Sequence, residues 1–390
     1  MKKKIVIISN YYPPEIGAAA NRIKNLAEGL SSYNNDVNVI CPLPNYPKGE
    51  VFKEYKRKFS VKETINNVDV NRYWIYPSIS KKPLLRFFSM ISFSLTLWFS
   101  FFKLFKKKPD LFIIQSPPLF IALSGLILSK VLKVNNVLNV SDIWPLSALE
   151  LGVIKKGRFY SLLERIEKYN YFLADKIIGQ SDEIIEHINL KINKGTEVYR
   201  NAPVYKKYTS KEKSEQLKIV YAGLLGYAQG IFNLCKHIDF KELGVELHIY
   251  GAGMEEEKII NFINTQDNNI FFHGSVSALE IKKRIREHDI ALVPLLTTIK
   301  GAVPSKIFEL MQLGIPILYV GGGEGEEIIK NKNLGFSSTP GNIDDLIENI
   351  LLFKSLSKEH YSKLSNNCIY HHKEEFNFEN QLNKIRKFIL

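Results

Sequence analysis

The sequence predicts an α/β protein made of two doubly wound parallel-sheet units in tandem. Apolar, β-branched runs alternate with helical patterns in the first half of the chain, and the same alternation restarts after Gln216. A polar segment without periodicity, Arg200–Gln216, separates the two halves. Apolar strands of this kind are buried between covering helices. Ligands of such sheets bind beyond the carboxyl ends of the strands, so we expect two units facing each other across a cleft.

Taken in order, each apolar run predicts one strand. In the first half the strands are "KKIVIIS", which precedes an amphipathic helix at Asn21–Tyr33, then "DVNVIC", "DLFIIQS", "NNVLNVS" and "DKIIGQS". In the second half they are "LKIVYAG", "VELHIYG", "NIFFHG", "DIALVPL" and "IPILYV". This order predicts a first domain over residues 1–200 and a second over 201–370. The helical pattern in "FNFENQLNKIRKFIL" predicts a C-terminal helix over residues 371–390.

The amino-acid composition limits the classes of function that this chain can have. The chain has 390 residues and a formal net charge of +13, which favours an anionic partner: nucleic acid, an acidic membrane surface or a phosphorylated small molecule. Its three cysteines have no paired spacing, which suits a reducing cytosol. No sequence motif for reading DNA or RNA is present, so a nucleic-acid binder stays only as an alternative. No Asp-x-Asp pair or histidine spacing indicates a metal site.

The most apolar stretch predicts a membrane-associating helix near residues 84–105. Between Phe87 and Phe102 there is no charged residue, while basic clusters flank the stretch on both sides. Such a helix is about 24 Å long, short of the roughly 30 Å hydrocarbon core. Serines and Thr96 recur on one face, and Phe, Leu, Ile and Trp98 are expected on the other. We therefore expect a monotopic helix on the inner leaflet of the cytoplasmic membrane; a buried core helix is the alternative.

Glycine turns after strands predict phosphate-binding loops. The small-residue turns contain Gly17, Gly223, Gly226, Gly251 and Gly253. Glycine lets backbone amides approach a phosphate closely, although a purely structural turn is the alternative for each one.

The segment "VPSKIFELMQLGIPIL" adds a cation where a helix dipole disfavours one. Pro304 and Ser305 are helix-start signals, so Lys306 shares the first turn with free amides. A diphosphate would satisfy both, and Glu309, one turn deeper, could accept hydrogen bonds from ribose hydroxyls. The alternative is a solvated glutamate and an ordinary surface lysine.

These stretches together resemble family-4 glycosyltransferases of the GT-B fold, which has two Rossmann-like domains. The resemblance implies that the C-terminal helix at residues 371–390 crosses back to the first domain. The likeness is nearest to bacterial enzymes of O-antigen and capsule synthesis, including the fucosamine-transferase-like group. It spans almost the whole chain through "YYPPEIGAAANRIKNLAEGL", "PNYPKG", "SDIWPLSALELG", "YAGLLGYAQG", "YGAG" and "VPSKIFELMQLGIPIL".

The resemblance implies roles for particular residues. Glu309 matches the glutamate that holds the nucleotide ribose, whereas its usual partner eight positions upstream is replaced by Gly301. Gln229 and neutral neighbours stand where many relatives carry a basic pair, so phosphate neutralisation falls on Lys306 and Arg200. Asp142 matches a position on the acceptor side, where capping of the next helix is the alternative.

The implied reaction is retaining transfer of a sugar from a nucleotide sugar, with UDP favoured, to a lipid-linked glycan on a polyprenyl diphosphate carrier. No metal or other cofactor is expected, because amides and a lysine would stabilise the departing diphosphate. A nucleotide-sugar 2-epimerase, which shares the architecture, is the alternative enzyme.

Overall fold

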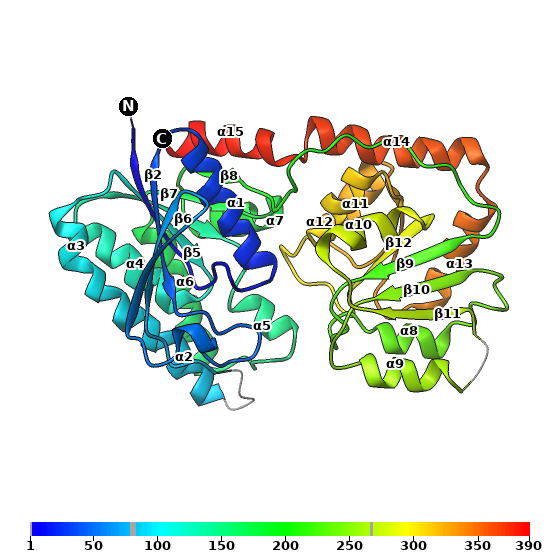
Figure 1. Cartoon of the computed structure of the whole chain (residues 1–390), viewed down its shortest axis with the longest axis horizontal. Coiled ribbons are helices and arrows are strands. Elements are labelled where there is room, and N and C mark those ends of the chain that lie inside the picture. The colour runs from blue at the N-terminus through cyan, green and yellow to red at the C-terminus, as the bar shows by residue number, and fades with distance from the viewer. Residues whose placement is uncertain (1, 79–82, 266–267) are drawn as a thin grey trace. The chain divides into compact units, whose positions relative to one another are not determined.

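The computed structural model describes residues 2–78, 83–265 and 268–390, and the chain divides into two compact units (Figure 1). Unit 1 runs to Asn201 and also includes Leu382–Leu390, whereas unit 2 is Ala202–Gln381. The structure thus divides the chain after residues 201 and 381, whereas the sequence predicted domain boundaries after residues 200 and 370. Each unit has its own parallel sheet with helices on both faces, which confirms the predicted fold class.

Unit 1 is built on an eight-stranded sheet with the order β3-β4-β2-β1-β5-β6-β7-β8, parallel except for the β3–β4 pair. Its strands are β1 (Lys4–Ile8), β2 (Asp36–Pro42), β3 (Ser60–Ile65), β4 (Val68–Tyr73), β5 (Leu111–Ser116), β6 (Asn135–Val140), β7 (Lys176–Gly179) and β8 (Thr196–Val198). Its helices are α1 (Ala18–Ser32), η1 (Lys53–Tyr55), α2 (Pro83–Thr96), η2 (Leu97–Ser100), α3 (Phe101–Lys106), α4 (Leu119–Val131), α5 (Leu146–Glu150), α6 (Arg158–Leu173) and α7 (Asp182–Asn189).

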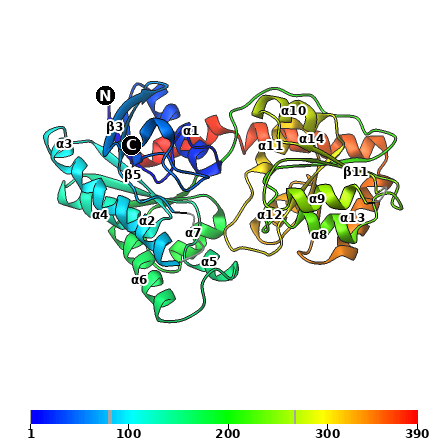
Figure 2. The same ribbon diagram turned by 60° about the horizontal axis from the view of Figure 1, so that its bottom comes forward.

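Two sets of helices cover the sheet of unit 1. Residues of α2, η2, α3, α4 and α6 pack into one apolar core with the strands. Helix α1 lies on the other side of the sheet, as two views show (Figures 1 and 2). The final helix, α15 (Phe378–Ile389), ends on this unit: Tyr33 Oη donates to Asn383 Oδ1 over 2.7 Å, and Lys384 forms an ion pair with Glu197 over 2.7 Å.

Unit 2 has a six-stranded parallel sheet with the order β11-β10-β9-β12-β13-β14, the arrangement of a dinucleotide-binding fold. The strands are β9 (Lys218–Ala222), β10 (Glu246–Tyr250), β11 (Ile270–Gly274), β12 (Ile290–Pro294), β13 (Ile317–Val320) and β14 (Gly335–Ser338). The helices are α8 (Ile231–His237), α9 (Glu256–Ile263), α10 (Ala278–Arg286), α11 (Lys306–Leu313), α12 (Glu324–Asn331), α13 (Ile343–Ser355) and α14 (Lys358–Glu374).

Strand order defines where a ligand can bind in unit 2. Helices α8, α9 and α13 contribute to the core on one face of the sheet, and α10, α11 and α12 to the core on the other. The connections from β9 and β12 therefore leave in opposite directions between two neighbouring strands. In folds with this strand order, ligands bind at such a switch point, at the carboxyl ends of the strands. Gly223, in the loop after β9, and Lys306, the first residue of α11, lie at these carboxyl ends.

Candidate functional site

Two glycine loops pack backbone to backbone at the carboxyl ends of β9 and β10. Gly223 N donates to Tyr250 O over 2.9 Å, and Leu225 N donates to Ala252 O over 3.0 Å. A Cβ on Gly251 would lie 1.9 Å from Gly223 O, and one on Gly253 would lie 2.4 Å from Leu225 O. Both residues must therefore be glycine for this approach to exist. The structure thus brings together four of the glycines that the sequence singled out, since Gly226 lies in the same loop.

Lys306 points at this pair of loops from the first residue of α11. Its ammonium lies so close to Gly223 that a Cβ there would stand 1.9 Å from Nζ, and Nζ sits 4.6 Å from the centroid of the Tyr221 ring. Burial lowers the pKa of Lys306 to about 8, and the nearby Glu309 carboxylate only partly offsets that effect. Among the described residues, no acceptor forms a hydrogen bond or ion pair with this ammonium. The lysine is thus a half-buried cation without an anionic partner.

The start of α11 adds donors beside the lysine. Ser305 occupies the N-cap position, but its side chain makes no capping hydrogen bond. Pro304 precedes it and accepts from Ile307 N over 3.0 Å. Gly314 closes the helix in the left-handed conformation at φ 66°, so the helix spans only eight residues. Because no side chain caps this helix, amides of its first turn can donate to a negatively charged ligand.

Glu309 lies one turn further along α11 and remains exposed. The surrounding protein raises the pKa of its carboxyl group by desolvation, while Lys282 and Lys306 act in the opposite direction. It accepts no hydrogen bond from any protein group in the described parts of the chain. A carboxylate with both oxygens available can accept from two vicinal hydroxyls of a ribose. Gln312, three residues further along α11, is buried and donates to Val204 O.

Gln229 belongs to the same loop as Gly226. A Cβ on Gly226 would lie 2.9 Å from Gln229 Oε1, and that buried oxygen has no hydrogen-bond partner among the described residues. A buried polar atom without a partner is costly, and a ligand that supplies a donor removes the cost. Sequence reasoning treated Gln229 only as a missing cation; its amide is a further candidate for contacting the ligand.

The remaining predicted site residues lie in unit 1. Gly17 is the N-cap of α1, beside the ring of Tyr46, and no side chain caps this helix. Arg200 forms an ion pair of 2.6 Å with Asp182, so part of its charge is already neutralised. The structure therefore divides the predicted residues between the units: Gly17, Asp142 and Arg200 in unit 1, and the others in unit 2.

Asp142 follows β6 and is held by the helix after it. Ser147 Oγ donates to Asp142 Oδ2 over 2.9 Å, but α5 has Pro145 at its N-cap, and no side chain caps it. The alternative of a helix-capping aspartate is therefore wrong. Burial raises the pKa of Asp142 to about 6, against hydrogen bonds from Ser147 and the Ile143 amide that lower it. A carboxyl group with this pKa exchanges protons near neutrality.

The sequence reasoning missed Glu15, which organises the loop leading to Gly17. Its carboxylate is buried and accepts from Tyr12 N over 3.2 Å and from Asn45 N and Tyr46 N over 2.9 Å each. Burial raises the pKa of Glu15, and these amides partly offset the rise. The sequence signal for Glu15 was an acidic residue inside a Pro- and Gly-rich turn. If such a turn is buried, its carboxylate must accept hydrogen bonds from nearby backbone amides.

The apolar segment of unit 1 exposes its phenylalanines and buries its hydroxyls. Ser94, Thr96 and Ser100 are buried, and Thr96 Oγ1 donates to Trp74 O over 2.7 Å. The outward side chains form what we call the apolar stripe: Phe88, Leu95, Phe99, Phe102 and Phe105. Phe102 is 75% exposed. Trp98, expected on the outer face, instead packs on the core and donates to Ser124 Oγ over 3.0 Å.

The segment Phe88–Lys106 is long and apolar enough to cross a membrane by length and composition alone, with a third of its most apolar window buried. The flanking Lys81 and Lys82 lie outside the described residues. Among the described residues no group of three or more His, Cys, Asp or Glu side chains could hold a metal ion.

Residues 206–373 match the family model described as Glycosyl transferases group 1. No curated protein matches the chain. Among solved structures, sucrose-phosphate synthase from Thermosynechococcus elongatus is 14% identical, with a TM-score of 0.73 over 99% of this chain and 98% of that chain.

Two further structures are similar over nearly their full lengths. HepE of Anabaena in complex with UDP is 14% identical, with a TM-score of 0.68 over 98% of each chain. The lipopolysaccharide outer core galactosyltransferase WaaB is 20% identical, with a TM-score of 0.63 over 98% of this chain and 99% of that chain. At these identities the likeness establishes a common fold, which is the GT-B fold of two parallel-sheet domains.

Proposed function

We propose that this chain, whose residues 206–373 form a Glycosyl transferases group 1 domain, is a retaining glycosyltransferase of the family-4 type that uses a UDP-sugar. The observation that carries the proposal is Lys306, a half-buried ammonium without an acceptor beside two glycine loops. A half-buried cation without a counter-ion is costly, and a diphosphate relieves that cost. UDP bound to HepE, a protein of the same fold, supports the choice of nucleotide.

In the proposed reaction the bond between the anomeric carbon and the diphosphate oxygen breaks, and a bond to the acceptor oxygen forms on the same face. The diphosphate leaves with the bonding electron pair, and the acceptor hydroxyl passes its proton to the departing diphosphate oxygen on the same face. Lys306 and the amides at the start of α11 stabilise the charge that develops on the leaving oxygen. Glu309 holds the ribose and so fixes the donor in place. The proposal assigns charge stabilisation to these groups and to no metal ion.

Asp142 is assigned to the acceptor side. Its carboxyl group, with a pKa of about 6, is mostly ionised at neutral pH and able to accept a hydrogen bond from an acceptor hydroxyl. Arg200 and the N-terminus of α1 at Gly17 are assigned to phosphate neutralisation in unit 1. These assignments come from the resemblance and from the chemistry of each group. Each can be tested by substituting that residue alone.

The proposed acceptor is a glycan on a polyprenyl diphosphate carrier at the inner face of the cytoplasmic membrane, in the synthesis of a bacterial surface polysaccharide such as O-antigen or capsule. The apolar stripe supports this location, because exposed phenylalanines beside Lys106 and Lys107 match an interface of acyl chains and anionic headgroups. The lipopolysaccharide core transferase among the similar structures is consistent with a glycolipid acceptor.

The test measures melting temperature against a panel of nucleotides and nucleotide sugars, since a ligand that binds the folded state raises it. UDP and one UDP-sugar should stabilise the wild type, and Lys306→Ala should remove most of the shift. Radiolabelled sugar should then move to a lipid extract with its anomeric configuration retained. No shift with any nucleotide would contradict the proposal. Conversion of the donor to its epimer without an acceptor would instead identify the 2-epimerase.

A further inference from the structure

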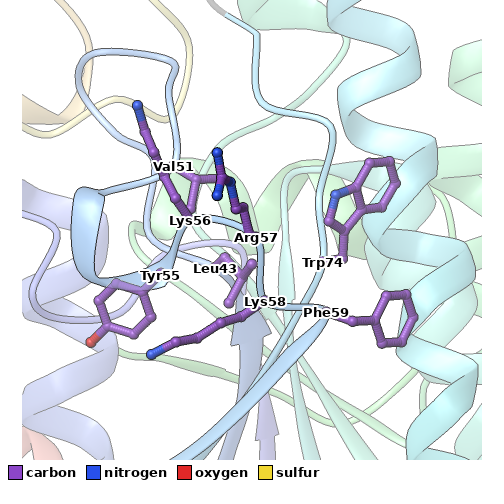
Figure 3. Close-up of a pocket in the computed structure, with 8 residues that line it drawn as sticks. All are labelled: Leu43, Val51, Tyr55, Lys56, Arg57, Lys58, Phe59 and Trp74. Atoms are coloured by element: carbon purple, nitrogen blue, oxygen red, sulfur yellow. The ribbon is translucent and has the colours of Figure 1, made fainter.

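A basic pocket lies in unit 1, in the part of the chain that leads into the β3–β4 hairpin. It has a volume of about 300 Å³, and its lining includes Lys56, Arg57, Phe59 and Trp74 (Figure 3). Figure 3 shows Lys56 and Arg57 on one side of the pocket and the rings of Phe59 and Trp74 on the other, with Leu43 between them. No residue of the candidate donor site belongs to this lining.

The cations of the pocket are poorly neutralised. Lys56 is 3.9 Å from Glu50, an exposed pair of the kind that contributes little. Arg57 has no ion pair in the described parts of the chain, and no acidic side chain lines the pocket. Lys58, the third consecutive cation, leans toward Tyr55, with Nζ 6.0 Å from the ring centroid. The pocket therefore presents uncompensated positive charge to solvent.

Arg57 lies in a turn whose backbone conformation is unfavourable for arginine. Tyr55–Lys58 form a tight turn in which Lys58 N donates to Tyr55 O, and Arg57 sits in the left-handed region at φ 62°. Turns of this shape favour glycine at that position, and arginine adopts it at a penalty. Arginine therefore stands at a position where glycine would be less strained, and such strain is typical of residues whose side chains have a functional role.

The aromatic side of the pocket continues into the apolar stripe. Phe59 packs edge-on against Phe99, with ring centroids 4.9 Å apart. The carbonyl of Trp74 accepts from Thr96 Oγ1, which fixes the β4 end of the pocket to the helical segment that carries the stripe. A ligand in the pocket thus has cations at one end and a path of exposed phenylalanines leading away from it.

We propose that this pocket binds the diphosphate of a polyprenyl carrier while the isoprenoid chain follows the apolar stripe. The inference rests on the proposed function for the nature of the acceptor. Lys56 and Arg57 form charge-assisted hydrogen bonds to the phosphate oxygens, with Lys58 close by. Phe59 and Trp74 pack on the first isoprene units. Attraction to anionic membranes in general accounts for the charge but not for a pocket that joins cations to aromatic rings.

The experiment measures binding to phosphatidylcholine vesicles that carry a small fraction of polyprenyl diphosphate. Control vesicles carry phosphatidylglycerol at equal total charge, and inorganic diphosphate is the soluble competitor. The wild type should bind the polyprenyl diphosphate vesicles at least tenfold more tightly than the charge-matched vesicles. Inorganic diphosphate should compete only weakly, because it lacks the isoprenoid contacts.

The test variant is Lys56→Ser with Arg57→Gly, which removes two charges and places glycine at the left-handed position. Its melting temperature should be unchanged or higher, so a loss of binding cannot be attributed to misfolding. The matched control is Lys155→Ser with Lys156→Ser, two exposed lysines of the same unit that do not line the pocket. The test variant should lose the tenfold preference, and the control should retain it.

Three results would overturn the proposal: equal binding to both kinds of vesicle by the wild type, an intact preference in the test variant, or full competition by inorganic diphosphate. The vesicle measurement uses no nucleotide. If UDP failed to bind, the proposed function would be refuted, but the vesicle measurement would still test the pocket. If UDP bound but the wild type showed no preference for polyprenyl diphosphate vesicles, only the proposal for the pocket would be refuted.

Discussion

The ammonium of Lys306 fills the space that a side chain on Gly223 would occupy, 1.9 Å from the position of its Cβ. The two residues are 83 positions apart and meet only because β9 and β12 are neighbours in the sheet. We expect Gly223→Ala to displace the ammonium and lower kcat by roughly 100-fold, the scale seen when one stabilising donor is lost. Steady-state sugar transfer measures this effect. The melting temperature should hardly change, because the displaced group is the end of a flexible side chain; full activity would exclude the assigned role.

Binding of UDP should weaken as the pH rises through about 8. The pKa of Lys306 in the free protein is lowered to about 8 from 10.5, so above that pH the group that receives the phosphate becomes neutral. The unfolded chain binds this proton more tightly, so between pH 8 and 10.5 the contribution of Lys306 to the free energy of unfolding rises with pH. Calorimetric titration with UDP at several pH values measures the first effect. Lys306→Met should bind UDP weakly without this pH dependence, whereas an unchanged dependence would point to another group.

Gly251→Ala should destabilise unit 2. The new Cβ would lie 1.9 Å from Gly223 O, and a backbone carbonyl cannot move away as a side chain can. Overpacking of this kind costs about 1–3 kcal/mol or more, so both the melting temperature and the response to UDP should fall. Gly157→Ala is the matched control, because nothing lies within 4 Å of its Cβ position and its backbone is extended at φ 167°. Equal melting temperatures for the two variants would contradict the close approach of the loops.

Removal of the Glu15 carboxylate should loosen the loop before Gly17. Glu15→Ala leaves the amides of Tyr12, Asn45 and Tyr46 without their acceptor, at about 1–3 kcal/mol for each unsatisfied buried donor. Glu15→Gln keeps one carbonyl oxygen as an acceptor, so it should lose less stability than Glu15→Ala. Urea unfolding of the three proteins measures the series. An alanine variant as stable as the wild type would mean that water replaces the carboxylate.

Mild acid should weaken unit 2. Burial lowers the pKa of both His288 and His372 to about 4, from 6.5. Between those values the unfolded state binds more protons, so the free energy of unfolding falls as the pH falls from 6.5 toward 4. Melting temperatures measured from pH 7.5 to 5 should show this decline, and His372→Gln should reduce its slope. A flat profile over this range would contradict the buried, neutral state of the two histidines.

Long apolar runs were sufficient to predict five adjacent strands in each sheet, because their burial on two faces leaves a continuous pattern. The hairpin of β3 and β4 was missed. Its residues alternate between charged and apolar and lie at the sheet edge, and its signal was the pair Asn66–Asn67, which adopts φ 49° and 64° in the turn. Strands β8 and β14 are short and lack an apolar run, so no pattern marked them.

The candidate site was predictable residue by residue but not as an arrangement. Helical spacing alone placed Lys306 and Glu309 one turn apart. Strand order, which brings Gly223 to Lys306, is a tertiary property that no local pattern carries. The apolar segment illustrates the same limit: the spacing gathered the hydroxyls on one face, but only packing against β4 and α4 determined that this face turns inward.

The contact between the loops after β9 and β10 also constrains how the donor pocket can move. Carbonyl and amide groups meet there with no side chain between them, so one loop cannot slide past the other without breaking the hydrogen bonds at Gly223 and Leu225. The two loops therefore form one rigid unit. Beside this rigid contact lies the end of the long side chain of Lys306, which can change its conformation while the two backbones stay in place.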